Sequence, residues 1–275
     1  MKKWYAVIGD PIAHSLSPFM HETWFSQYDV DAAYIPLHIE PSNLKNAFDS
    51  MKTLGISGFN VTLPHKQAII PCLDKTDETA MSMNAVNTVS FDGTHYAGSN
   101  TDGDGFVQSL FVHDIKLDLP VLIIGAGGAA RGISFALKRA QFTDVSITNR
   151  TFRRAEELAK ATGSSALLLT DAEKRLGEFG IIIQTTSVGL ADGEALPLSI
   201  VNLESGTLVA DIIYNPLETP FLREARKKQC NILNGVGMFV YQGAIAFEKW
   251  TGIKPDTEEM IELITQKLGG NYVNR

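Results

Sequence analysis

The stretch "LPVLIIGAGGAARGISFALKRA", Leu119–Ala140, restricts the fold more than any other part of the sequence. Its first six residues form a short apolar run of the kind that becomes a buried strand, and from Ala129 onward the apolar residues have helical spacing. Gly125 to Gly128 lie between the two, where the chain turns from strand to helix. A strand, a glycine-rich turn and a helix in this order are typical of an α/β fold that binds a dinucleotide.

The turn itself reads "GAGGAA", with an alanine in the third position of the usual glycine fingerprint. Glycines at the start of a helix let backbone N–H groups approach a pyrophosphate without interference from a Cβ atom. Alanine is accepted in the third position, where only close packing of the helix is required. The alternative is a glycine-rich turn without a ligand. The candidate pyrophosphate-binding residues are Gly125, Ala126, Gly127, Gly128, Ala129 and Ala130.

The residues after the next predicted strand, "TNRTFRR", indicate which dinucleotide is bound. A site for NAD usually places Asp or Glu about twenty residues beyond the first glycine, where it holds the ribose 2′-hydroxyl. Here Asn149 is neutral, and Arg150, Arg153 and Arg154 add positive charge where a 2′-phosphate would lie. An ordinary basic helix start is the alternative, but the helix dipole disfavours positive charge there. The sequence therefore favours NADP.

The first hundred residues alternate between strand-like and helix-like segments. Strands are predicted at 4–9, 32–39 and 58–63, and helices at 17–28 and 42–54. This βαβαβ pattern predicts a parallel sheet with right-handed crossovers. Asp92-Gly93 then indicates a hairpin, and a helix is expected to begin near Asp102.

A second α/β half follows the glycine-rich turn. Further strands are predicted within 144–150, 179–187 and 206–214, with helices at 152–161 and 219–229. The two halves join near residue 102. The last two predicted elements are amphipathic helices at 237–252 and 257–268. Their apolar faces must pack on another part of the protein.

Composition excludes several classes of protein. Hydrophobic residues make up 44% and charged residues 20% of 275 positions, as expected for a globular chain, and the net charge of -7 argues against a nucleic-acid partner. Cys72 and Cys230 lie far apart and suggest neither a disulfide framework nor a zinc or other metal site. No segment has the length of a signal-peptide core or a membrane helix. We expect a soluble, cytoplasmic protein with a small-molecule partner and no membrane partner.

The stretch "GFNVTLPHK", Gly58–Lys66, ends in hydrogen-bonding side chains instead of a plain polar turn. Lys66 follows a strand that Pro64 ends, at the strand edge where open α/β sheets bind ligands. A nicotinamide cofactor implies hydride transfer, which requires a partner for the proton. Lys66 is the candidate, with Asp102 beside it, although either residue alone is more often a solvated surface group. Predicted strand ends or loops also carry Ser15, Ser17, Asn60, Thr62 and Asn87, which together would form a polar pocket for a hydroxylated substrate.

Eight short motifs occur in order between Gly9 and Gly252. They are "SLSP" at 15–18, "GFNVTLPHK" at 58–66, "NAVNT" at 84–88, "NTDG" at 100–103, "GAGGAAR" at 125–131, "NRT" at 149–151, "YNP" at 214–216 and "GVGMFVYQGAIAFEKWTG" at 235–252. In these motifs the sequence resembles the shikimate dehydrogenase family. The resemblance implies NADP-dependent, reversible reduction of 3-dehydroshikimate to shikimate in aromatic amino-acid biosynthesis. It also implies an α/β fold of two domains, in a monomer or homodimer: a substrate domain of residues 1–102 plus 239–275 with a mainly parallel sheet, and a Rossmann NADP-binding domain of residues 103–238.

The resemblance also implies roles for individual residues. It makes Lys66 the catalytic acid/base and Asp102 its partner. The substrate ligands become Ser15, Ser17, Thr62, Asn87, Asp102, Tyr214 and Gln242, with Asn60 supporting them. Besides the glycine-rich turn, the cofactor residues become Glu78, Asn149, Arg150, Thr151, Arg154, Ile212, Gly235 and Met238.

Two other readings stay open. One is a paralogous dehydrogenase that accepts quinate or uses NAD, and the neutral Asn149 followed by Arg150 argues against the NAD form. The other is a non-catalytic NADP-binding regulatory protein on the same fold, against which the intact Lys66 and Asp102 argue. Packing or loop roles are predicted for His14, His21, His65, Phe239, Tyr241, Phe247 and Trp250.

Overall fold

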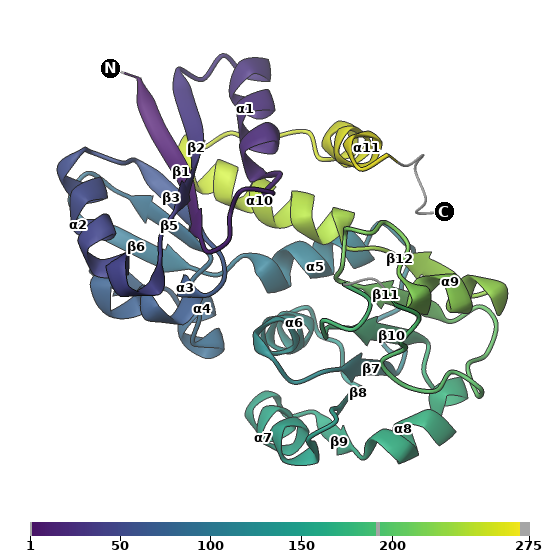
Figure 1. Ribbon diagram of the computed structural model, residues 1–275. Coiled ribbons are helices and arrows are strands. Elements are labelled where there is room, and N and C mark those ends of the chain that lie inside the picture. The colour runs from purple at the N-terminus through teal and green to yellow at the C-terminus, as the bar shows by residue number, and fades with distance from the viewer. Residues whose placement is uncertain (1, 191–192, 270–275) are drawn as a thin grey trace. The chain divides into compact units, whose positions relative to one another are not determined.

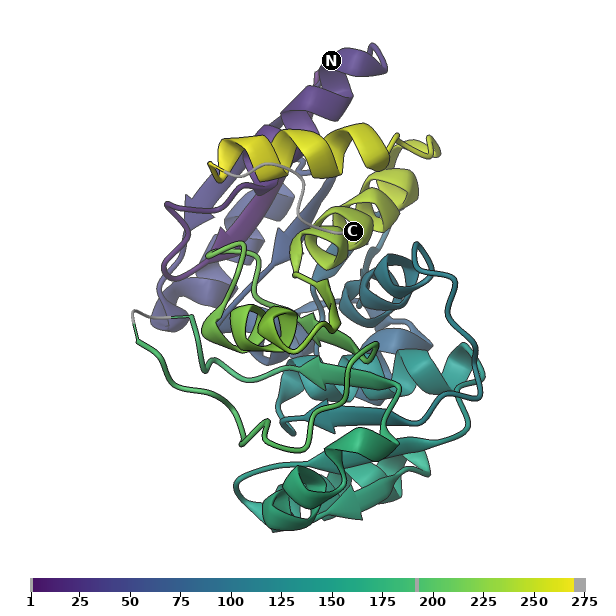
Figure 2. The same cartoon turned by 90° about the vertical axis from the view of Figure 1, so that its right-hand side faces the viewer.

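The computed structural model describes residues 2–190 and 193–269 and divides the chain into two compact units. Unit 1 comprises the chain up to Asp102 together with Gln242–Met260, and unit 2 comprises Gly103–Tyr241 and the chain from Ile261 onward. Among the described residues, each unit contains one six-stranded sheet with helices packed on it (Figures 1 and 2). The predicted α/β class is therefore confirmed, and each unit is described by itself.

The sheet of unit 1 has the strand order β2-β1-β3-β5-β6-β4. β1, β2 and β3 are parallel, β5 runs antiparallel to both β3 and β6, and β4 is parallel to β6. The predicted βαβαβ unit and the hairpin at Asp92-Gly93 are confirmed. The strands are β1 (Lys3–Gly9), β2 (Ala32–His38), β3 (Gly58–Val61), β4 (Lys75–Thr76), β5 (Thr88–Phe91) and β6 (Tyr96–Ser99).

Alternation along the strands assigns side chains to the two faces of this sheet. Phe59 of β3 packs in one core cluster with Phe48 of α2 (Leu44–Thr53). On the opposite face, Tyr5 of β1 stacks on Trp250 of α10 (Val236–Thr251) at 4.8 Å between ring centroids, and α1 (Ser17–Gln27) covers the same side (Figure 1). Asn60 alternates with Phe59 and therefore lies on the α10 face. The prediction that β3 runs to residue 63 was wrong, because the chain leaves the sheet after Val61.

His21 and its neighbours fill the space between α1, α10 and the sheet. The imidazole is fully buried and stacks on Tyr34 at 4.5 Å between ring centroids, with Trp24, Phe247 and Trp250 around it. Burial among apolar rings lowers the pKa of His21 to about 3, so the ring is neutral. The predicted packing roles of His21, Phe247 and Trp250 are confirmed.

The sheet of unit 2 is wholly parallel, with the order β12-β11-β10-β7-β8-β9. The chain proceeds outward from β7 through β8 to β9, and then returns to the other side of β7 with β10. This reversal makes the position between β7 and β10 the topological switch point, where such sheets bind ligands. The strands are β7 (Val121–Ile124), β8 (Val145–Thr148), β9 (Ser165–Leu167), β10 (Ile181–Gln184), β11 (Leu208–Asp211) and β12 (Asn231–Leu233).

Both faces of this second sheet are covered by helices. Ile123 of β7 packs in one cluster with residues of α6 (Gly128–Arg139) and α7 (Phe152–Thr162), whereas Leu122 packs in another with Phe221 of α9 (Pro220–Lys227). Burial on both faces explains why β7 reads as a continuous apolar run. The predicted strand at 119–124 begins two residues later, at Val121, after Pro120, which has no N–H to donate. The predicted helix after the glycine-rich turn begins one residue earlier than expected, at Gly128.

The remaining helices have the following bounds. In unit 1 they are α3 (His65–Ala68) and α4 (Glu78–Met83), with short 3-10 turns at Pro41–Asn43 and Ile70–Cys72; α5 (Asp102–Leu110) begins at the last residue of unit 1. Unit 2 contains α6 (Gly128–Arg139), α7 (Phe152–Thr162), α8 (Leu169–Lys174), a 3-10 turn at Leu176–Glu178 and α9 (Pro220–Lys227), and α11 is Glu258–Lys267. None of the helices in the described part of the chain is long and apolar enough to cross a membrane.

Candidate functional site

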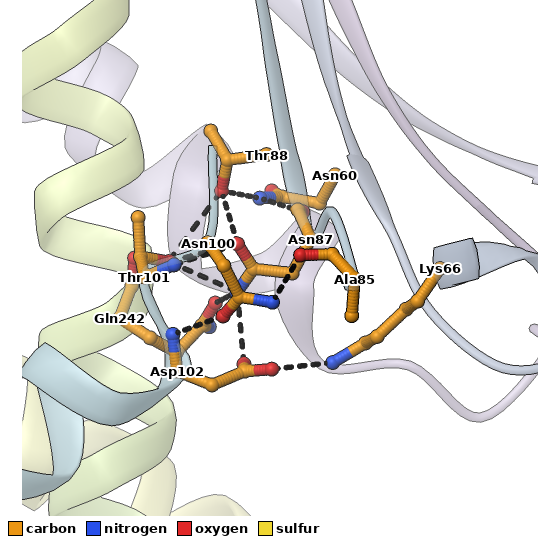
Figure 3. A network of polar contacts seen from close by, with 9 residues as sticks. All are labelled: Asn60, Lys66, Ala85, Asn87, Thr88, Asn100, Thr101, Asp102 and Gln242. Atoms are coloured by element: carbon orange, nitrogen blue, oxygen red, sulfur yellow. Dashed lines mark hydrogen bonds and ion pairs between the residues drawn. The ribbon is translucent and has the colours of Figure 1, made fainter. Parts of the chain in front are cut away.

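Lys66 and Asp102 form an ion pair at one edge of the sheet of unit 1. Lys66 lies in the short helix α3, which follows β3, and Asp102 is the first residue of α5, which follows β6. The distance from Lys66 Nζ to Asp102 Oδ2 is 2.6 Å, with 26% of the lysine and 16% of the aspartate side chain exposed (Figure 3). The pair is thus half-buried yet open to a ligand. The two candidate catalytic residues, 36 positions apart in the chain, are in direct contact.

Asn87 holds the second oxygen of the same carboxylate. Its Nδ2 donates to Asp102 Oδ1 at 2.8 Å and to Thr101 Oγ1 at 3.0 Å. Its Oδ1 accepts from the Thr101 N–H and from Thr88 Oγ1, each at 2.9 Å. Both ends of this buried amide therefore have protein partners, and Asp102 is oriented through both of its oxygens (Figure 3). Asn87 reaches this edge because β5 is antiparallel, so that the start of β5 lies beside the ends of β3 and β6.

Asn100 is a further member of this network that the sequence reasoning missed. Its Oδ1 accepts from the backbone N–H of Asp102 at 3.0 Å, and its Nδ2 donates to the carbonyl of Ala85 at 2.9 Å. The buried amide thereby joins the loop before β5 to the start of α5. An Asn two residues before an acidic helix start is the local signal that predicts such a cap.

Asn60 supports the site from within β3. Its Nδ2 donates to the carbonyl of Asn87 and to Thr88 Oγ1, each at 3.2 Å, and its Oδ1 accepts from the hydroxyl of Tyr34 at 2.7 Å. Burial raises the pKa of Tyr34 well above its usual value, so the hydroxyl keeps the proton that it donates. The Asn60 amide is occupied by these three partners. This geometry fits the supporting role that the family resemblance implies.

The other predicted substrate residues differ in their position. Gln242, on the part of α10 that belongs to unit 1, accepts from Thr101 Oγ1 through its carbonyl at 3.0 Å, and its Oε1 lies 3.4 Å from Asn87 Nδ2. Ser15 Oγ accepts from the Ser17 N–H at the start of α1, and Thr62 directly follows β3. Tyr214 belongs to unit 2, where it stacks on Phe239. His65 donates to the carbonyl of Ile39 at 2.6 Å and is buried, which confirms its predicted packed, hydrogen-bonded role, although it lies in α3 and not in a loop.

The family resemblance makes Gln242 a ligand of shikimate, the substrate that it implies, so we expect Gln242→Ala to raise the KM for shikimate with little change in kcat. Loss of one neutral hydrogen-bonding partner costs about 0.5 to 1.5 kcal/mol, which corresponds to a factor of about two to twelve in affinity. Steady-state kinetics with shikimate as the varied substrate give both constants. Glu248→Ala, an exposed change on the same helix, is the control and leaves both unchanged. An unaltered KM in Gln242→Ala would return this residue to the packing role of its neighbours.

The glycine-rich turn of unit 2 is open to a ligand. A Cβ atom on Gly127 or Gly128 would meet no other atom of the described residues within 4 Å, so the first N–H groups of α6 are accessible to an anion. Gly125 has a φ of +117°, and a Cβ there would clash with Thr185 Oγ1. Ala130 is fully buried against the sheet, as the third fingerprint position requires. The residues present therefore fit a pyrophosphate.

The basic residues after β8 also fit a phosphate. Asn149 Nδ2 donates to the carbonyl of Thr151 at 2.9 Å and shapes the turn before α7. Arg153 forms an ion pair with Glu157, whereas no acidic partner within 4.0 Å is found for Arg150 or Arg154 among the described residues. Both of these arginines are exposed. The helix dipole disfavours positive charge at the start of α7, yet Arg150 and Arg154 both lie there and are available to bind an anion.

Two further segments complete this edge of unit 2. Ala126, Ile212 and Met238 are partly buried and pack against one core cluster, and a Cβ on Gly235 would clash with the carbonyl of Ile212.

The sequence reasoning missed the loop after β10. There the buried Gln184 donates to the carbonyls of Thr186 and Val188, at 3.1 and 2.9 Å, beside the glycine-rich turn. The polar run "QTTS" after an apolar strand is the signal that predicts it. Glu78 is exposed in the first turn of α4, in unit 1.

The strand order of unit 2 and its open glycine-rich turn define a dinucleotide-binding protein of the Rossmann class. Three family models match the sequence: the shikimate dehydrogenase substrate binding domain at residues 7–89, shikimate / quinate 5-dehydrogenase at residues 112–191, and the shikimate 5′-dehydrogenase C-terminal domain at residues 235–265. The chain belongs to the shikimate dehydrogenase family, as its motifs predicted. It is therefore an oxidoreductase that acts on a CH–OH group.

Three known proteins illustrate this relationship. The shikimate dehydrogenase (NADP(+)) of Lysinibacillus sphaericus is 52% identical over 277 residues, covering 98% of this chain and 100% of the relative. The crystal structure of shikimate 5-dehydrogenase from Thermus thermophilus in complex with NADP(H) and shikimate has a TM-score of 0.90 at 36% identity, covering 97% of this chain and 99% of that one. Quinate dehydrogenase from Corynebacterium glutamicum in complex with NAD has a TM-score of 0.86 at 29% identity, covering 95% and 98%.

Proposed function

We propose that this chain catalyses the reversible, NADP-dependent reduction of 3-dehydroshikimate to shikimate in aromatic amino-acid biosynthesis. The observation that carries the proposal is the Lys66–Asp102 pair, fixed by Asn87 at the sheet edge of unit 1. Support comes from the names of relatives that span the full chain, such as the NADP(+) enzyme of Lysinibacillus sphaericus. An acid/base group beside hydrogen-bonding side chains suits a hydroxylated, carbonyl-containing substrate.

Lys66 transfers the proton in this mechanism. An ammonium group has three N–H donors, and Asp102 accepts one of them, which leaves two for the reacting oxygen of the substrate. During reduction Lys66 protonates this oxygen, and during oxidation its neutral amine removes the proton from the hydroxyl. The positive charge also stabilises the alkoxide as it develops. Asp102 orients the ammonium group of Lys66 through their ion pair, and Asn87 orients Asp102 through its hydrogen bond to Oδ1.

The substrate ring is bound by hydroxyl and amide groups. Ser15, Ser17 and Thr62 supply hydroxyls after β1 and β3, and Asn60 holds Asn87 in place from behind. The proposed ligands are Ser15, Ser17, Thr62, Asn87, Asp102, Tyr214 and Gln242. We assign substrate binding to residues 1–102 and 239–275.

NADP is the cofactor in this proposal, and it supplies or accepts the hydride when bound. The open N–H groups at Gly127 and Gly128 fit its pyrophosphate, and the exposed Arg150 and Arg154 fit its 2′-phosphate. The residues that would hold it are Glu78, Gly125, Ala126, Gly127, Gly128, Ala129, Ala130, Asn149, Arg150, Thr151, Arg154, Ile212, Gly235 and Met238.

One assay separates this function from its two alternatives. Formation of the reduced cofactor is followed by absorbance, first with shikimate and NADP, then with quinate and NADP, and then with shikimate and NAD, where the product is NADH. We expect turnover with shikimate and NADP to exceed turnover with quinate or with NAD. Quinate is the second candidate substrate, because the quinate dehydrogenase of Corynebacterium glutamicum shares the fold over 95% of this chain. Absence of turnover with either substrate would support the regulatory reading.

A further inference from the structure

Asp211 is the last residue of β11 and a buried carboxylate to which neither the motifs nor the mechanism assigns a role. Its side chain is 1% exposed, and it follows the apolar strand at the same edge of the sheet as the glycine-rich turn. An ionised group at such a depth is costly unless it is hydrogen-bonded. Its contacts therefore indicate what it does.

The carboxylate joins the two ends of one loop. Oδ1 accepts from the N–H of Ile213 at 3.0 Å, and Oδ2 accepts from the hydroxyl of Thr219 at 2.8 Å. Thr219 is buried and caps α9, because its Oγ1 also accepts from the N–H of Leu222 at 3.3 Å. Asp211 thus bonds to both ends of residues 212–218, which we name the 212–218 loop.

Three further contacts hold the same loop. The carbonyl of Ile213 accepts from the N–H of Gly235 at 3.0 Å, and Asn234 Nδ2 donates to the carbonyl of Leu217 at 3.1 Å. The ring of Tyr214 stacks on Phe239 at 4.9 Å between centroids. These contacts fix the conformation of the loop that carries Ile212 and Tyr214, which the proposed function assigns to NADP and to the substrate.

We propose that Asp211 is a positioning residue for the reaction, because it sets the conformation of the 212–218 loop, which carries Ile212 and Tyr214. This inference rests on the proposed function. Misplacement of binding groups by about 1 Å can cost about a hundredfold in rate. Because one buried carboxylate bonds to both ends of the loop, a change in that carboxylate is expected to shift the loop and lower the rate.

The surroundings of Asp211 give the proposal a pH signature. No lysine, arginine or histidine of the described residues forms an ion pair with it; on α9, Arg223 pairs with Glu194, Arg226 with Glu218 of the loop, and Lys227 with Glu224. β10 places the neutral Gln184 beside it. Burial without a charged partner raises the pKa of Asp211 to about 6. A proton taken up there removes one of the two acceptors that close the loop.

Stability and affinity are expected to respond to pH in opposite directions. Between the ordinary carboxyl pKa of 3.8 and the raised value of about 6, the folded state binds more protons than the unfolded state. This group therefore favours folding increasingly as the pH falls through that interval. The affinity for shikimate and NADPH falls over the same interval, because the loop loses an acceptor. A carboxyl group with a purely structural role would change stability with pH without an opposite change in the affinity for shikimate and NADPH.

The test uses Asp211→Asn, which keeps the size of the side chain and one acceptor oxygen. NADPH binding is titrated by its own fluorescence, kinetics are measured with shikimate, and unfolding is followed by circular dichroism, all between pH 5 and 8. We expect kcat/KM for shikimate and the affinity for NADPH to fall about tenfold at pH 7.5 without loss of Tm. The acid-side change in affinity near pH 6 also disappears in this variant.

Two variants of Thr219 complete the test. Thr219→Ser keeps the hydroxyl and is expected to behave as wild type, whereas Thr219→Val removes the donor to Asp211 and reproduces the loss of affinity. Wild-type NADPH affinity and wild-type kcat/KM in Asp211→Asn would overturn the inference. The inference would also be overturned if Asp211→Asn had a lower Tm and its losses of affinity and of kcat/KM were explained by that lower stability. If wild type itself does not turn over shikimate, the proposed function fails, and the NADPH titration still decides whether Asp211 positions the loop.

Discussion

Lys66→Ala is expected to lower kcat by about 10² to 10⁴ while leaving the KM for shikimate within a few-fold of wild type. The ammonium transfers the proton and stabilises the developing alkoxide, so its interactions strengthen in the transition state more than in the ground state. Substrate binding depends mainly on the hydroxyl and amide groups around it. Steady-state kinetics in both directions of the reaction give kcat and KM for the variant.

Lys75→Ala is a matched control for this experiment. Lys75 Nζ lies 2.7 Å from Asp92 Oδ2, nearly the distance of the Lys66–Asp102 pair, but these side chains are about half exposed, at 53% and 47%. An exposed ion pair contributes at most about 1 kcal/mol to stability, and this pair is not part of the site. We expect wild-type kcat from Lys75→Ala. A Lys66→Ala variant that keeps more than about a tenth of wild-type kcat would show that another group transfers the proton.

The second large effect is expected in cofactor choice. Arg150→Ala is predicted to weaken NADP by about ten- to a hundredfold and to leave NAD nearly unchanged, because a charge-assisted hydrogen bond to the 2′-phosphate contributes about 1.5 to 3 kcal/mol. NAD lacks that phosphate. Asn149→Asp is expected to disfavour NADP as well, because it places a negative charge against the phosphate. The measurement is kcat/KM for both cofactors with shikimate saturating.

Arg153→Ala serves as the control for the arginine experiment. Arg153 lies in the same helix start but already pairs with Glu157 at 2.9 Å, with both side chains exposed. We expect it to change neither cofactor's kcat/KM appreciably. Equal losses for NADP and NAD in Arg150→Ala would mean that Arg150 supports the fold and does not distinguish the two cofactors.

The sequence by itself predicted the α/β class of both units and the positions of most longer elements. Buried parallel strands such as β7 are apolar on both faces, so their segments are recognisable without tertiary information. The glycine-rich turn is equally local, because a strand, four turn residues and a helix follow one another directly. Shorter elements such as β4, β9 and β12, with two or three residues each, carry too little periodicity to be predicted.

Lys66 and Asp102 were predicted to lie side by side, and the ion pair confirms this; Asn87 was predicted as a site residue, but its bond to Asp102 was not. Asn87 reaches Asp102 because β5 runs antiparallel between β3 and β6, and strand direction depends on pairing that the local sequence does not encode. The Asn100 cap of Asp102 has a local signal, but the bond from Asn100 Nδ2 to the carbonyl of Ala85, 15 residues away, has none. A residue's type and spacing indicate what it can bond to, and only the register of the sheet decides which partner is within reach.

Asp211 shows most clearly which properties the local sequence determines and which depend on the tertiary structure. The sequence determined that an aspartate follows an apolar strand, which by itself describes an ordinary polar strand end. The tertiary structure closes the 212–218 loop over it, buries the carboxylate, and supplies Ile213 and Thr219 as its donors. Local pattern decides secondary structure because it depends on neighbouring residues. Burial, hydrogen-bond partners and pKa depend on residues brought together by the sheet, so only the tertiary structure decided them.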